Sequence, residues 1–220
     1  MKILYESWHV LAWGLLKTVE LFVLSALLAL STAFLLGVLR VYGPKHVRLI
    51  CTVLAEILRG VSTVVVLFWL YFALPFLGVS LSAGVAAVLG LGLVHGAYSS
   101  EVVRGALISV GAGQWEAASA LGLSRLRTVG LIILPQALLI MMPSLGNAMI
   151  LLLKGTSLAS IITVHELTFQ GSLIVTRTLA TFTVFSIVLV VYYVLSLLIL
   201  AAFRRAERQM GRWRPRASVP

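Results

Sequence analysis

The sequence predicts an all-helical (all-α) integral membrane protein, built as a single transmembrane domain over residues 1–220. Hydrophobic residues make up 60% of the chain and charged residues only 11%, a balance too apolar for a soluble domain of this size. The apolar residues also fall in runs that approach the ~20 residues a helix needs to cross a bilayer. These runs occupy most of the chain, so we expect several transmembrane helices and no sizeable soluble domain.

The apolar runs predict five transmembrane helices. The expected spans are residues 18–39, 49–74, 81–100, 129–153 and 179–203. The first is closed by Arg40, Gly43 and Pro44, and the second ends in aromatic residues that suit a membrane interface, followed by the helix breaker Pro75. Between the spans, residues 101–128 hold no run long enough to cross, and residues 154–178 form a less regular connection.

Two of the spans carry residues that bear on packing. Gly92, Gly96 and Ser100 recur every four residues in the third span, a spacing that lets another helix approach closely. Pro135 and Pro143 are expected to kink the fourth span.

The basic residues predict the topology, because lysine and arginine favour the cytoplasmic side of a membrane. With the C-terminus inside, the cytoplasmic set is Arg40, Lys45, Arg48, Arg104, Arg125, Arg127, Arg204, Arg205, Arg208, Arg212, Arg214 and Arg216, and the outside set is Lys2, Lys17, Lys154 and Arg177. We therefore expect the N-terminus outside and the C-terminus inside. The net charge of +10 is then explained by the topology and by a basic C-terminal tail that anchors on anionic membrane lipid. No nucleic acid is expected as a partner.

A fairly polar segment begins at residue 116 and reads EAASALGLSRLRTVGLIILP. Its residues alone predict a short helix over 114–121, with Glu116 near the start, where the helix dipole favours a carboxylate. Gly122 is expected to end this helix as a C-terminal cap, and residues 123–126 to form a turn that leads into the fourth span. This pattern by itself describes an ordinary loop helix at the inner face of the membrane.

The same segment resembles the EAA signature of the permease subunits of ATP-binding cassette (ABC) importers. That signature is EAA, three residues, a glycine, nine residues and IxLP, and its fixed positions are here Glu116, Ala117, Ala118, Gly122, Ile132, Leu134 and Pro135. The flanking stretches AYSSEVVRGALISVGAGQW and LPQALLIMMPSLGNAMILLLKGTSLASII are similar to the polar amino-acid uptake branch. The resemblance extends from about Gly14 to the end of the fifth span.

The resemblance implies a type I ABC importer permease fold in a bacterial inner membrane, with residues 112–128 as a cytoplasmic coupling region. In that family the coupling helix docks on a cytoplasmic ATP-binding subunit. Ala117 and Ala118 would permit close contact, Glu116 would cap its own helix or meet a basic group of the partner, and Pro135 would carry the motion into the fourth span. The implied partners are two ATP-binding subunits, a second permease that is the same or homologous, and an extracytoplasmic solute-binding protein.

The chain itself lacks the residues for ATP chemistry, so we expect a transport subunit and not an enzyme. It has no GxxxxGK[ST] sequence and no aspartate to hold magnesium. Cys51 is the only cysteine, and neither His95 nor His165 has a second ligand at metal spacing, so no cofactor and no metal site are expected.

The candidate translocation pathway consists of polar residues in or next to the spans: Glu56, Arg59, Asn147, Thr156 and Ser157. Glu56 and Arg59 lie three residues apart on one helix face, so they either pair with each other or point together into a polar path. Asn147, Thr156 and Ser157, with Glu166, lie at or beyond the outer end of the fourth span, where they either meet the solute or cap helices.

The solute is expected to be small and polar or zwitterionic, either an amino acid or a compatible solute like ectoine. The chain departs from the amino-acid branch at three places: Val61-Ser62 with Val66 in the second span, Gly155 where the branch commonly has aspartate, and Leu139 in place of arginine. The segments RGVS and LFWLYFALP are similar to the corresponding segments of ectoine permeases. An ion-coupled secondary transporter or channel acting without an ATPase is the alternative function, and a non-transporting membrane assembly factor is a third.

Overall fold

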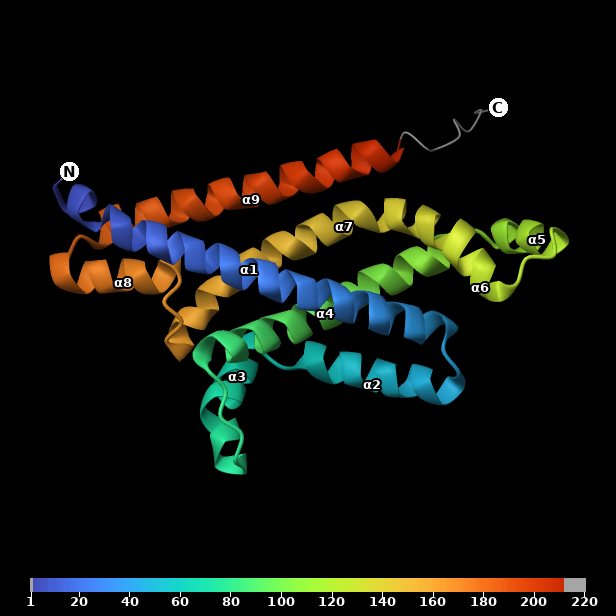
Figure 1. The fold of residues 1–220 in the computed structure, drawn as a ribbon, viewed down its shortest axis with the longest axis horizontal. Coiled ribbons are helices and arrows are strands. Elements are labelled where there is room, and N and C mark those ends of the chain that lie inside the picture. Colours follow the sequence, from blue (N-terminus) through green and yellow to red (C-terminus); the bar gives the residue numbers. More distant parts are fainter. Residues whose placement is uncertain (1, 212–220) are drawn as a thin grey trace.

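The computed structural model describes residues 2–211, with side chains described from residue 8, and every element in that part of the chain is helical. The elements are α1 (Lys2–Tyr42), α2 (Lys45–Gly60), α3 (Thr63–Phe68), η1 (Trp69–Ala73), η2 (Leu74–Leu77), α4 (Ala83–Ser109), α5 (Ala112–Ala120), α6 (Arg125–Thr128), η3 (Val129–Ile133), α7 (Leu134–Gly155), η4 (Thr156–Ile162), α8 (Leu167–Thr178) and α9 (Thr181–Gly211). Figure 1 shows an elongated bundle with α5 and α6 at one end and the start of α1 at the other. Arg212, Arg214 and Arg216 of the basic tail lie outside the described residues.

Helices α1 and α4 pack closely along their length, because glycines remove side chains from the contact. A Cβ atom at Gly96 would lie 2.7 Å from Thr32 Cβ and 2.9 Å from the carbonyl oxygen of Ala29, and one at Gly92 would lie 2.7 Å from the side chain of Leu28. The expected ridge of small residues therefore provides the close approach of the two helices.

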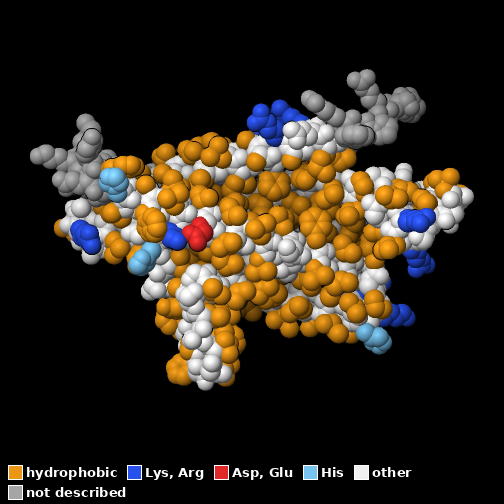
Figure 2. All heavy atoms as spheres, in the orientation of Figure 1, with side chains coloured by type: hydrophobic (Ala, Val, Ile, Leu, Met, Phe, Trp, Pro, Cys, Tyr) orange, Lys and Arg blue, Asp and Glu red, His pale blue; other side chains and the backbone are white. Residues whose placement is uncertain are grey.

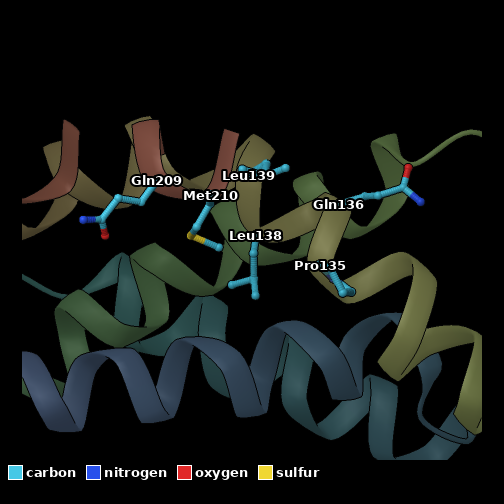
Figure 3. Close-up of a pocket in the computed structure, with 6 residues that line it drawn as sticks. All are labelled: Pro135, Gln136, Leu138, Leu139, Gln209 and Met210. Atoms are coloured by element: carbon cyan, nitrogen blue, oxygen red, sulfur yellow. The ribbon is translucent and has the colours of Figure 1, made fainter. Parts of the chain in front are cut away.

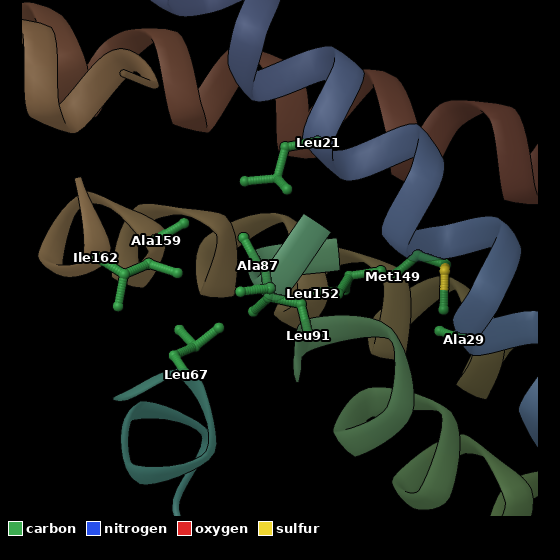
Figure 4. Packing of buried hydrophobic residues seen from close by; sticks show 10 residues of the cluster. Leu21, Ala29, Leu67, Ala87, Leu91, Met149, Leu152, Ala159 and Ile162 are labelled. Carbon is green, nitrogen blue, oxygen red and sulfur yellow. The ribbon is translucent and has the colours of Figure 1, made fainter. Parts of the chain in front are cut away.

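The buried core joins four parts of the chain that are distant in sequence. One cluster brings Leu21 and Ala29 of α1 together with Leu91 of α4, Leu152 of α7 and Leu67 of α3, as Figure 4 shows. A second cluster lies nearer α5 and includes Ile133 and Met141. On the face shown in Figure 2, apolar side chains cover most of the surface, and lysines and arginines are few, most of them near its edges. This distribution fits a protein surrounded by lipid.

Four helical segments of the described chain are long and apolar enough to cross a membrane. They are Trp8–Tyr42, Ala83–Ser109, Arg125–Ile162 and Thr181–Gly211. A fifth crossing is possible only if the bent pair Lys45–Gly60 and Thr63–Leu77 acts as one span.

The expected second span, residues 49–74, is not one continuous helix. Helix α2 ends at Gly60, and the axis turns by 98° before α3 begins. Val61 and Ser62 adopt extended backbone angles, with ψ of 140° and 134°, which interrupts the helical hydrogen bonds. The hydropathy of a segment shows how long and how apolar it is, but not whether two of its residues adopt extended backbone angles. The hydropathy pattern therefore does not predict this break.

The ends of the other polar segments also differ from expectation. Helix α4 continues to Ser109, so Glu101 and Arg104 belong to it and the interruption begins only at Val110. The expected connection over 154–178 is largely ordered, as the 3₁₀ helix η4 and then α8. In both places, helical hydrogen bonds continue past the point where the sequence becomes polar.

Pro75 and Pro135 both follow a widened helical turn. The N–H of Leu74 donates to the carbonyl of Trp69, and that of Leu134 donates to the carbonyl of Val129, so each bond spans five residues instead of four. A proline ring crowds the preceding turn and has no N–H to donate, and a π turn relieves that crowding. Pro75 was expected to end its helix, but a 3₁₀ turn carries the helix on to Leu77.

Candidate coupling site and ionic network

Helix α5 ends in a backbone arrangement that needs a glycine. The N–H of Leu123 donates to the carbonyl of Ala118 at 3.0 Å, and the N–H of Gly122 donates to the carbonyl of Ser119 at 3.0 Å. These two bonds form a Schellman cap, with Gly122 at the left-handed position and φ of 69°. The predicted C-terminal cap is confirmed, and it turns the chain sharply from α5 towards α6.

Glu116 lies on the surface of α5 and has no hydrogen bond or ion pair within the described residues. The expectation that it stands near the start of its helix is wrong, because α5 begins at Ala112 and has no acidic residue in its first turn. Gly111 is the N-cap residue, so Glu116 does not cap its own helix either. The carboxylate is therefore free to meet a group outside this chain.

The two alanines of the signature face opposite ways. Ala117 is exposed, whereas Ala118 is only 1% exposed and lies against the chain itself. The side chain of Trp115 also packs inward, against the second core cluster, and its ring centroid lies 5.8 Å from that of Tyr42 at the end of α1. The small size of Ala118 thus brings α5 close to its own helices, and a partner docking on α5 as it lies here meets Ala117.

A side-chain hydrogen bond joins α5 to α7. Gln136 donates from Nε2 to Oε1 of Gln114 at 3.1 Å and to the carbonyl oxygen of Ile132 at 3.0 Å. Gln136 and Pro135 also line a pocket of about 460 Å³ together with Leu138, Leu139, Gln209 and Met210, drawn in Figure 3. The pocket is thus lined by the start of α7 and the end of α9.

Ile132, Leu134 and Pro135 lie where η3 continues into α7. Ile132 and Leu134 are half-buried against the second core cluster, and Pro135 is exposed. The chain therefore runs from Glu116 to Pro135 through four successive elements: the exposed helix α5, the cap at Gly122, the short helix α6 and the widened turn η3.

Glu56 and Arg59 form an ion pair, with Arg59 Nη1 at 3.0 Å from Glu56 Oε1. They belong to a larger cluster, here called the ionic network, which consists of Arg40, Glu56, Arg59, Glu101 and Arg104. Arg40 is central and largely buried, with its side chain 6% exposed, at 3.1 Å from Glu101 and 3.7 Å from Glu56. Of the two alternatives for Glu56 and Arg59, pairing is the one seen in this conformation.

Arg40, Glu101 and Arg104 were not among the candidate site residues. From the sequence, Arg40 reads as a topology determinant and Glu101 as part of a polar loop, because sequence does not show that α1, α2 and α4 meet at one depth. The spacing of Glu101 and Arg104 does carry a signal, since residues three apart on a helix form a pair.

Of the other three candidate pathway residues, Thr156 and Ser157 are engaged in local contacts. Thr156 is fully buried and donates to the carbonyl of Leu153 at 2.6 Å, and Ser157 donates to the carbonyl of Lys154 at 2.8 Å. Asn147 is exposed on α7. No hydrogen bond or ion pair in the described chain joins these three residues to Glu56 or Arg59.

Glu166 acts as the N-cap of α8. Its two carboxylate oxygens accept the N–H groups of Thr168 at 2.9 Å and Phe169 at 2.8 Å, and Tyr192 donates its hydroxyl at 2.9 Å. The residue is fully buried, and this burial raises the pKa of its carboxyl above the ordinary value. Of the two roles considered for Glu166, the structure shows the helix cap.

The described residues contain no group of three histidine, cysteine or acidic side chains that would hold a metal ion. Cys51 is buried on the face of α2 that packs against Leu36.

These features define a class: a helical membrane protein with a short helix, α5, exposed at one end and linked by side chains to two long helices, α1 and α7. The family model described as "Binding-protein-dependent transport system inner membrane component" matches residues 22–212. The chain belongs to this family. It is therefore a membrane-embedded permease subunit of an ABC importer, and the ATPase is a separate subunit, as the sequence predicted.

Relatives match over nearly the whole chain. The probable amino-acid ABC transporter permease protein y4tF of Sinorhizobium fredii is 37% identical, over 94% of this chain and 92% of its own length. The glutamine transport system permease protein GlnP of Escherichia coli is 38% identical, over 90% of this chain and 91% of its own. The crystal structure of an amino acid ABC transporter with histidines superposes with a TM-score of 0.86 at 27% identity, covering 94% of this chain and 96% of that one. The all-helical permease fold is confirmed, and these relatives give no support to ectoine.

Proposed function

We propose that the chain imports an amino acid into the cytoplasm by alternating access, driven by ATP-binding subunits that dock on α5. The observation that carries this proposal is the exposed carboxylate of Glu116, which has no hydrogen bond or ion pair among the described residues. It lies on a helix that is capped by Gly122 and bonded to α7 through Gln114. An amino acid is favoured over ectoine because the relatives described above are amino-acid permeases or transporters.

The coupling residues of the proposal are Glu116, Ala117, Ala118, Gly122, Ile132, Leu134 and Pro135. Glu116 and Ala117 form the surface that meets the ATP-binding subunit. Ala118 and Gly122 fix the position of that surface, because one is buried against the chain and the other sets the turn. Ile132, Leu134 and Pro135 connect the turn to α7, so a push on α5 reaches a long membrane helix.

The proposed assembly contains two ATP-binding subunits, a second permease subunit and an extracytoplasmic binding protein. The side of the molecule that carries the ionic network is the side we assign to the second subunit and the pathway. Glu56 is 57% exposed and Glu101 is 33% exposed, and charged side chains at membrane depth face protein or water and avoid lipid. Helix α9 suits a lipid-facing position, because its exposed residues between Phe185 and Ala202 are all apolar or aromatic.

The pathway of the proposal includes Glu56 and Arg59 at its inner end and Asn147, Thr156 and Ser157 at its outer end. Thr156 is buried here, so its role is to support the outer end in this conformation. The N-terminus lies outside and the C-terminus inside, which puts α5 and the basic residues around it in the cytoplasm. An ion-coupled mechanism has less support, because Glu56 and Arg59 neutralise each other.

Transport is tested in proteoliposomes that contain the permease with its ATP-binding subunit and binding protein. Uptake of a labelled amino acid is expected to stop with vanadate and to continue with a protonophore. The opposite result would identify an ion-coupled transporter and reject the proposal.

The docking role is tested by Glu116→Lys, with Glu20→Lys as the matched control, since Glu20 is an exposed glutamate on α1. We expect Glu116→Lys to reach the membrane in normal yield but to lose the ATP-binding subunit on purification, while Glu20→Lys retains it. Equal retention by both variants would remove α5 from the docking site.

A further inference from the structure

The contacts of the ionic network fall into two groups of different length. Within the α1–α4 pair, Arg40 Nη1 lies 3.1 Å from Glu101 Oε2, and Arg104 donates from Nε to Glu101 Oε1 at 2.9 Å. Within α2, Arg59 lies 3.0 Å from Glu56. The two ion pairs that connect α2 to the other helices are longer: Arg40 to Glu56 at 3.7 Å and Arg59 to Glu101 at 3.8 Å.

Packing divides the helices in the same way. Helices α1 and α4 interlock through glycines, and a Cβ atom at Gly37 would lie 2.6 Å from the side chain of Val103. Helix α2 rests on α1 through a small cluster, whose buried members are Leu36, Cys51 and Ala55. A tightly packed pair and a lightly attached helix therefore meet at the ionic network.

The end of α2 is held by one more residue of α4. Tyr98 donates its hydroxyl to the carbonyl oxygen of Arg59 at 2.7 Å, and the Arg59 guanidinium lies 5.7 Å from the centre of the Tyr98 ring. The carbonyl of Arg59 belongs to the last turn of α2, where carbonyls lack partners within the helix. The next residues form the 98° bend into α3, so Tyr98 holds α2 directly before that bend.

We propose that Arg40, Tyr98 and Glu101 are positioning residues for transport, and that they form a latch holding α2 against the α1–α4 pair. The latch consists of the two long ion pairs and the Tyr98 hydrogen bond. Its release lets α2 and the bend into α3 move relative to α1 and α4. This inference rests on the proposed transport function for its role, but its contacts are independent of that function.

The arrangement of charges allows α2 to separate from α1 and α4 while every carboxylate keeps a basic partner. After α2 separates, Glu56 keeps Arg59 within its own helix, and Glu101 keeps Arg40 and Arg104. An unpaired charge at membrane depth is costly, so a helix that moves there must carry its own counter-ion. Both sides of the latch meet this condition, which allows two alternative positions of α2.

Cys51 reports on the latch, because it is the only cysteine of the sequence and lies on the face of α2 that packs against α1, where it is 7% exposed. The test measures the rate at which N-ethylmaleimide modifies Cys51 in the purified full-length chain. We expect Tyr98→Phe to raise the rate about three- to tenfold, the range expected for losing one hydrogen bond. Tyr98→Phe removes only a hydroxyl and keeps the ring, so folding is preserved.

Lys17→Gln is the control, since Lys17 and Glu20 form an exposed ion pair on α1 at 2.8 Å, outside the network. This variant is expected to leave the Cys51 rate unchanged. A rate for Tyr98→Phe that equals the wild-type rate would overturn the latch.

A second measurement separates the latch from the proposed function. In proteoliposomes with the ATP-binding subunit and binding protein, Tyr98→Phe is expected to lower amino-acid uptake per ATP hydrolysed about threefold, the lower end of the same range, while ATPase activity persists. Normal uptake per ATP in this variant would overturn the positioning role even though the transport function holds. If wild type shows no ATP-driven uptake but Tyr98→Phe still exposes Cys51, the proposed function fails and the latch contacts stand.

Discussion

Gln136 on α7 donates a hydrogen bond to Gln114 on α5, with 3.1 Å between Nε2 and Oε1. The bond connects the exposed helix to a long membrane helix across a gap of 22 residues in sequence. It offers a direct route for force between them, separate from the backbone route through Gly122.

Replacing Gln136 by leucine removes this bond with little change in volume. We expect a loss of about 1 kcal/mol in the attachment of α5, typical for one hydrogen bond. The backbone amides of α5 would then exchange hydrogen faster by mass spectrometry. Gln209→Leu is the control, because Gln209 lines the same pocket but lies on α9. Unchanged exchange in α5 would show that the bond does not hold it.

Gly122→Ala is expected to weaken the turn after α5 by about 1 kcal/mol, because its φ of 69° is unfavourable for a residue with a Cβ. Apart from its neighbours in the chain, no atom of the described residues lies within 4 Å of a Cβ at this position, so the effect comes from the backbone angle alone. The matched control is Gly113→Ala on α5, which also adds a Cβ into open space. Retention of the ATP-binding subunit on purification is the measurement, and equal retention by the two variants would contradict the role of the cap.

Gly96→Ala is expected to destabilise the fold by about 1 to 3 kcal/mol, since the added methyl meets Thr32 and the backbone of Ala29. Gly84→Ala, in the same helix, adds a methyl with nothing within 4 Å. Thermal unfolding in detergent should show a lower midpoint for Gly96→Ala only. A similar midpoint for both variants would mean that α1 and α4 can move apart without loss.

Glu166 predicts a pH dependence of stability. Burial raises the pKa of its carboxyl in the folded state, so the folded protein binds this proton more tightly than the unfolded chain does. Its contribution is fully present below the unfolded pKa of about 4.3 and is lost as pH rises through the raised folded pKa. We therefore expect the difference in unfolding midpoint between wild type and Glu166→Gln to shift against wild type as pH rises across this window. A difference that stays constant with pH would contradict the raised pKa.

The composition and the apolar runs determined that this chain is a helical membrane protein, because a bilayer requires long apolar helices and little else. The EAA segment also indicated the family, and Gly122 the turn, since a left-handed residue after a helix has a local signature. These features depend on residues close together in sequence.

Tertiary structure decided the rest. The break at Val61 and Ser62, the inward direction of Ala118 and the meeting of Arg40 with Glu56 and Glu101 all depend on which helices pack together. The sequence around each of these residues does not show which helix packs against it. The burial of a charge and the side on which an alanine packs are therefore set by neighbours distant in the chain, and only the fold brings them together.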